Sequence, residues 1–91
     1  MTKRAKESFS AEELAVLSFL RERYETEGEI PKEVADIARG SDLDDGEEVL
    51  RALYTLEGKR LVQPEPEGDF TSRHWKITPV GVRALELLRA A

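Results

Sequence analysis

The side chains that most often perform catalysis or bind metals are scarce in this sequence. It contains one histidine, His74, and no cysteine among its 91 residues. A Ser-His-Asp or Cys-His catalytic set therefore has no support, and disulfides and thiolate metal sites are excluded. The acidic run at residues 42–48 superficially resembles a calcium-binding loop, but its glycine and its final acidic position fall out of register. We expect no enzymatic activity, no cofactor and no metal site.

Charged residues, in contrast, are abundant and unevenly distributed along this sequence. The chain has 14 Lys and Arg against 19 Asp and Glu, a net charge of −5, which disfavours a polyanionic partner. Residues 41–58 hold six acidic residues and a single basic one, Arg51, so this segment alone carries −5. Basic residues are concentrated in residues 1–9 and in residues 70–91, which carry +3. The negative charge that would repel a polyanion is therefore concentrated in residues 41–58 and is not a property of the whole chain.

Length and composition indicate a single small domain. Of the residues, 40% are apolar and 36% are charged, which supports one modest core. Uncharged runs are too short to span a membrane, and no apolar signal core follows the basic N-terminus. We expect a flexible basic arm at residues 1–9, one domain at residues 10–91, no membrane partner and a cytoplasmic location.

Capping residues and hydrophobic periodicity predict four helices. Ser10 and Glu13 form a capping box for the first, Asp44 caps the third, and Thr78 precedes Pro79 at the start of the last. The predicted helices cover residues 11–27, 32–39, 45–58 and 79–91. The expected core stripes comprise Leu14, Leu17, Leu20 and Tyr24 on the first helix and Val49, Leu53 and Leu56 on the third.

Between the third and last helices the pattern changes to that of a β-hairpin. Residues 61–65 and 70–77 read as two strands joined by the turn-rich residues 66–69. Because side chains alternate along a strand, Trp75 and Ile77 share the core face, while His74 and Lys76 share the solvent face.

Two stretches, in this order of elements, resemble a known family. In residues 49–62, apolar residues occupy the first, fifth, eighth and thirteenth places, and residues 75–85 match an aromatic-x-Leu-Thr-x-x-Gly-x-x-x-Leu passage with Ile77 at the leucine place. Together they resemble the winged-helix DNA-binding domains of small regulators. Such domains usually have glycine where this chain has Arg60. The resemblance implies an α+β winged helix-turn-helix with a three-helix core, a two-stranded hairpin wing and a C-terminal helix.

The resemblance also implies a function, namely double-stranded DNA binding and transcription regulation. The third helix of such a domain lies in the major groove, and its wing contacts the backbone or minor groove. The residues that would contact nucleic acid are then Arg51, Tyr54, Lys59, Arg60, Arg73, His74 and Lys76.

The acidic third helix supports an alternative, a protein-interaction winged helix that does not bind DNA. Leu50 and Tyr54 are spaced four apart and are predicted to be exposed beside the carboxylates, a surface that suits a basic protein partner. This set comprises Asp44, Asp45, Glu47, Glu48, Leu50 and Tyr54. Val80 and Leu87 leave a second apolar side on the last helix. This apolar side would either contribute to a homodimer interface, formed by the first and last helices, or be covered by Phe19 of the same chain.

Overall fold

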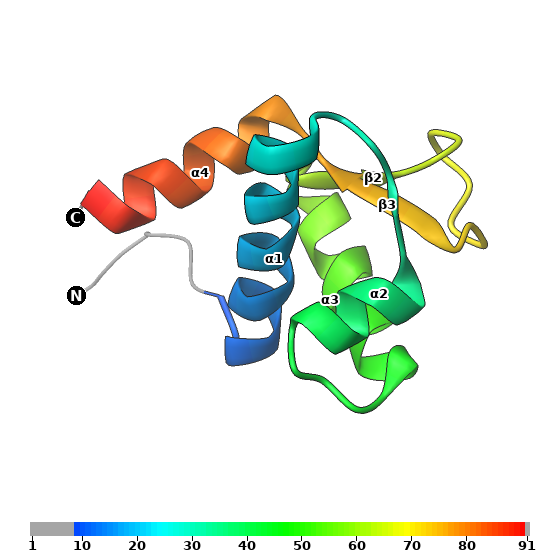
Figure 1. The fold of residues 1–91 in the computed structure, drawn as a ribbon. Helices are drawn as coiled ribbons and strands as arrows, with labels where there is room; N and C mark the ends of the chain where they lie inside the picture. Colours follow the sequence, from blue (N-terminus) through cyan, green and yellow to red (C-terminus); the bar gives the residue numbers. More distant parts are fainter. Residues whose placement is uncertain (1–8, 91) are drawn as a thin grey trace.

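The computed structural model describes residues 9–90, which form four helices and three strands (Figure 1). Of the predicted basic arm, all but Phe9 lies outside the described residues. The order of elements is the one that the sequence predicts for a winged helix, with one added strand before the second helix. The elements are α1 (Ala11–Glu27), β1 (Lys32–Glu33), α2 (Val34–Gly40), α3 (Gly46–Gly58), β2 (Val62–Pro64), β3 (His74–Ile77) and α4 (Pro79–Ala90).

Two of the three predicted helix caps are confirmed. The Ser10 side chain accepts from the backbone N–H of Glu13, and the Glu13 carboxylate accepts from the backbone N–H of Ser10, both at 3.1 Å. At α4, the Thr78 hydroxyl accepts from the backbone N–H of Gly81 at 3.0 Å. The predicted cap of α3 is wrong by one residue. Asp45 accepts from the N–H of Glu47 at 2.9 Å, because α3 begins at Gly46 and Asp45 is therefore the extended residue directly before its first turn.

The sheet has three antiparallel strands in the order β1-β3-β2, where the sequence predicted two. Lys32 pairs with Trp75 and Glu33 with His74, so these two residues are not the helical start that was predicted for them. They form a strand because β3 has an edge that β2 does not cover. The backbone hydrogen bonds along this edge continue one residue further, where the Val34 N–H donates to the Arg73 carbonyl at 2.8 Å. The returning strand is also shorter than predicted, because residues 70–73 belong to the wing loop.

The core is built around α1, which lies between α4 on one side and α2 and α3 on the other (Figure 1). Val16, Leu17, Phe19 and Leu20 of α1 are buried, a broader face than the predicted stripe, because the helix packs against neighbours on several sides. Leu14, predicted to be core, is 36% exposed.

The predicted stripe of α3 is confirmed, with Val49, Leu53 and Leu56 fully buried, and Trp75 and Ile77 of β3 are buried as predicted. Phe19 lies against Gly40 at the end of α2, where an added Cβ would be 2.9 Å from its Cζ and closer still to other ring atoms.

Helix α4 is attached mainly through its first half and projects away from the rest of the molecule (Figure 1). Its buried residues are Gly81 and Leu85. Arg21 of α1 adds an ion pair to Glu86 at 3.3 Å. The second half of α4 is therefore exposed along most of its surface.

Candidate nucleic-acid interface

The outward face of α3 carries less negative charge than the sequence suggests. With 100° of turn per residue, Glu47, Arg51 and Tyr54 lie opposite the buried stripe, and all three are exposed. Asp42 and Asp44 belong to the turn before the helix. Glu48 and Glu57 lie on its flanks and are half-buried. The −5 of this segment is therefore spread around the helix, and its outward face presents one carboxylate and one guanidinium.

The wing loop lies directly beside this outward face. The Tyr54 ring contacts Phe70 of the loop at a centroid distance of 6.0 Å, and its hydroxyl donates to the Phe70 carbonyl at 3.1 Å. Beneath both rings lies Trp75, which is fully buried and whose Nε1 donates to the Ser72 carbonyl at 3.0 Å. Helix and wing therefore form one continuous surface, and Trp75 belongs to the core, as predicted.

The predicted nucleic-acid-binding residues of α3 and its C-terminal turn point in different directions. Arg51 borders a depression of about 240 Å³ between α1 and α3 that is also lined by Glu12, Glu13 and Glu48. At the other end of α3, the Lys59 ammonium lies 4.4 Å from the centroid of the Phe9 ring. Arg60 follows it with a positive φ of 66°, so the position at which such domains usually have glycine has left-handed backbone in this chain.

The remaining predicted residues lie on or beside β3. His74 and Lys76 share its solvent face, as predicted, and each faces carboxylates. His74 Nε2 lies 3.6 Å from Glu33, and Lys76 Nζ lies 3.8 Å from both Glu29 and Glu65. Contacts of this length near the surface contribute little to stability.

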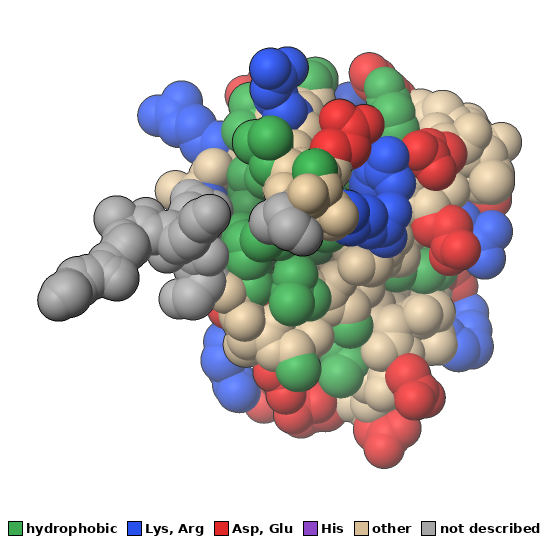
Figure 2. Space-filling view, turned by 90° about the vertical axis from the view of Figure 1, so that its left-hand side faces the viewer, with side chains coloured by type: hydrophobic (Ala, Val, Ile, Leu, Met, Phe, Trp, Pro, Cys, Tyr) green, Lys and Arg blue, Asp and Glu red, His purple; other side chains and the backbone are tan. Residues whose placement is uncertain are grey.

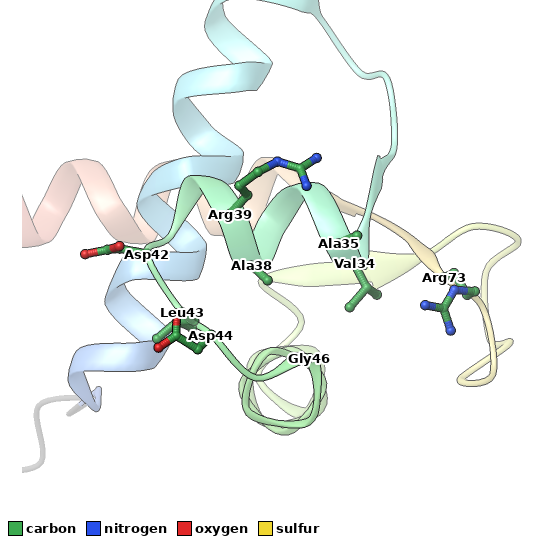
Figure 3. Close-up of a pocket in the computed structure, with 9 residues that line it drawn as sticks. All are labelled: Val34, Ala35, Ala38, Arg39, Asp42, Leu43, Asp44, Gly46 and Arg73. Carbon is green, nitrogen blue, oxygen red and sulfur yellow. The ribbon is translucent and has the colours of Figure 1, made fainter.

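Arg73 lies beside a pocket between α2 and the start of α3 (Figure 3). The pocket has a volume of about 470 Å³ and an apolar wall that includes Val34, Ala38 and Leu43. Arg39, from the last turn of α2, is a second cation of this pocket and pairs with Asp36. Sequence reasoning did not single out Arg39, although its place in the last turn of the helix before α3 was a signal for it.

The predicted protein-interaction surface is only partly assembled. Leu50, predicted to be exposed, is half-buried and packs against the core, because it lies on the flank of α3 that faces its neighbours. Tyr54 is 45% exposed but held by the wing. Four acidic residues of the set form no ion pair within residues 9–90. They are Asp44, Asp45, Glu47 and Glu48.

Among residues 9–90, no group of three or more His, Asp or Glu side chains is arranged to hold a metal ion. No helix in this part is long and apolar enough to cross a membrane.

Comparison with known proteins supports the fold. No protein-family model and no curated protein sequence matches the chain. Among solved structures, the chain is similar to a MarR family regulator from Neisseria meningitidis, with 25% sequence identity and a TM-score of 0.64. The match covers 90% of this chain and 54% of that regulator, so this chain spans about half of its length. The likeness confirms the predicted α+β winged-helix regulator fold.

Proposed function

We propose that this winged-helix chain is a transcription-regulatory module that binds duplex DNA through the outward face of α3 and the wing. The observation that carries the proposal is the continuous surface of α3 and wing loop, with Arg51 on the helix and Arg73 at the base of the loop. Likeness to a solved regulator supports the same role. As such a regulator, the chain would act in the cytoplasm.

Each part of this surface suits a different contact with DNA. Arg51 would reach a guanine edge or a phosphate from α3 in the major groove, and Glu47 would accept from a cytosine amino group. Arg73, His74 and Lys76 would hold the wing on the phosphate backbone. Lys59 and Arg60, at the end of α3 opposite its acidic start, would contact phosphates beside the groove.

The decisive experiment is a titration of labelled duplex DNA, followed by fluorescence anisotropy at two salt concentrations. With four to six phosphate contacts, affinity should fall about 10²–10³-fold between about 50 and 200 mM salt. Arg73→Ala should weaken binding to all sequences alike and lower the salt slope by about 1. Arg83→Ala, an exposed arginine on α4, is the matched control. Absence of binding by the wild type at the lower salt concentration would refute the proposal.

The exposed stripe of α4 suits a second copy of this chain. Val80 is 55% and Leu87 is 65% exposed. On the face toward which α4 projects, hydrophobic side chains gather in a band near the centre (Figure 2). Phe19 packs against Gly40 and leaves Val80 and Leu87 exposed. A dimer through α4 and α1 would present two copies of α3 to two DNA half-sites, as symmetric regulators do.

One observation favours the alternative of a protein-interaction domain that does not bind DNA. Tyr54 and Phe70 are 45% and 44% exposed, side by side. The tip of the wing carries Glu67 and Asp69 with no basic residue beside them. Aromatic anchors rimmed by carboxylates suit a basic protein segment. A labelled peptide of alternating lysine and arginine, titrated in the same assay, would bind in this case, and duplex DNA would not.

A further inference from the structure

One side chain of α3 ties the wing loop, residues 65–73, to the helix. The Tyr54 hydroxyl donates to the backbone carbonyl of Phe70 at 3.1 Å. Within residues 9–90, no other side chain of α3 hydrogen-bonds to this loop. Tyr54 is thus committed to a contact inside the protein, although almost half of its surface remains exposed.

The same tyrosine belongs to a cluster of three aromatic rings. Its ring meets that of Phe70 edge-to-face, at 6.0 Å and 89°, and lies 6.0 Å from the ring of Trp75. Phe70 and Trp75 are 6.2 Å apart, so each ring contacts the other two. Edge-to-face packing is a favoured aromatic geometry. Because Trp75 is fully buried, it fixes the base on which the other two rings rest.

The loop holds its own shape through internal hydrogen bonds. The Ser72 hydroxyl donates to the Glu65 carbonyl at 2.6 Å, which closes the base of the loop. The Asp69 carboxylate accepts from the backbone N–H of Thr71 at 3.0 Å, which orders its tip. These bonds are exposed to solvent, so they open readily unless the contact with Tyr54 also holds the loop against α3.

We infer that Tyr54 is a positioning residue, which fixes the wing against α3 before any ligand binds and thereby sets the spacing between Arg51 and Arg73. This inference rests on the proposed DNA-binding function and deepens it. It also changes the role of Tyr54, which the sequence predicted to be a contact residue. A wing fixed in advance loses little conformational freedom on binding, and this raises affinity without any additional contact.

The first test is amide hydrogen exchange on the full chain without DNA. Tyr54→Ala should raise exchange at Thr71 and Ser72, whose N–H groups are bonded within the loop, by about tenfold, with α1 and α2 unchanged. Tyr54→Phe keeps the ring, loses one hydrogen bond and should give a smaller rise, of about fivefold. The control is Thr55→Ala, an exposed neighbour whose hydroxyl bonds within its own helix. Unchanged exchange in the loop of Tyr54→Ala would overturn the inference, and so would a rise throughout the chain.

The second test compares DNA affinities of single and double variants. If Tyr54 acts through the wing, the double variant Tyr54→Ala/Arg73→Ala should bind no more weakly than Arg73→Ala alone, to within about twofold. If Tyr54 contacts DNA itself, the two losses will multiply and the inference is wrong. If the wild type binds no DNA, the proposed function fails, whereas the exchange experiment still decides whether Tyr54 positions the wing.

Discussion

Gly81 is the position at which one added methyl group should do most damage to this fold. A Cβ at residue 81 would lie 2.7 Å from Cγ1 of Ile77 and 3.0 Å from the carbonyl carbon of Leu61, and closer still to that carbonyl's oxygen. All three separations are shorter than ordinary van der Waals contact. Since a carbonyl oxygen of the backbone cannot rotate aside as a flexible side chain can, Gly81→Ala must push α4 away from the strand that follows Leu61.

The magnitude follows from the contacts that converge on this point. Overpacking of a tight core costs about 1–3 kcal/mol. The Leu61 carbonyl also accepts from the Thr78 N–H at 2.9 Å, and the Thr78 hydroxyl caps α4 at Gly81, so displacement endangers a cap worth about 1 kcal/mol. Alanine regains up to about 1 kcal/mol of helix propensity. The net loss in free energy of unfolding is therefore about 1–3 kcal/mol.

Thermal and urea unfolding followed by circular dichroism will measure this loss. For a domain of this size, about 1–3 kcal/mol corresponds to a fall in Tm of about 5–20 °C. Gly58→Ala is the matched control, since Gly58 is also helical and an added Cβ there meets nothing within 4 Å. It should raise stability by about 0.5–1 kcal/mol. A Gly81→Ala protein as stable as Gly58→Ala would refute this account of how α4 packs.

Three other predictions concern a cap, a backbone conformation and assembly. Ser10→Ala removes half of the capping box of α1 and should cost about 1 kcal/mol of stability in urea unfolding; no change would mean that Glu13 alone holds this helix end. Arg60→Gly relieves a left-handed residue at φ 66° and should add about 0.5–1 kcal/mol; a loss of stability would show that the arginine side chain contributes more than its strain costs. If α4 forms a dimer, Leu87→Glu should give a monomer in sedimentation velocity at concentrations where the wild type is dimeric, with stability of the monomer changed by less than about 0.5 kcal/mol; a wild type that stays monomeric at all concentrations would exclude the dimer.

Local signals in the sequence predicted the helices and the buried stripe of α3. The capping box of Ser10 and Glu13 and the Thr78 cap are short-range patterns, and both are present in the structure. The one-residue error at Asp45 arose because residues 42–45 include three aspartates in which spacing alone does not identify the cap.

Features that depend on distant parts of the chain could not be predicted from local pattern. Lys32 and Glu33 form a strand because β3 offers them an edge, a partner that arrives more than 40 residues later. Leu50 is half-buried because of neighbours of α3 that periodicity does not identify, and the Tyr54 contact depends on where the wing loop folds back. The seven residues predicted to contact nucleic acid remain a prediction, and the structure spreads them over α3, its C-terminal turn, the end of the wing loop and β3.

The pairing of β1 with β3 bears on the order in which this protein can fold during synthesis. Lys32 can pair with Trp75 only after Trp75, 43 residues further along the chain, has been synthesised. Trp75 is also one of the largest fully buried side chains of the core. A nascent chain that ends after α3 therefore lacks both the central strand and this core tryptophan. Contacts between such distant residues slow folding, because the chain between them must first be closed into a loop. The three-stranded sheet and the part of the core around Trp75 can thus form only after the wing has been synthesised.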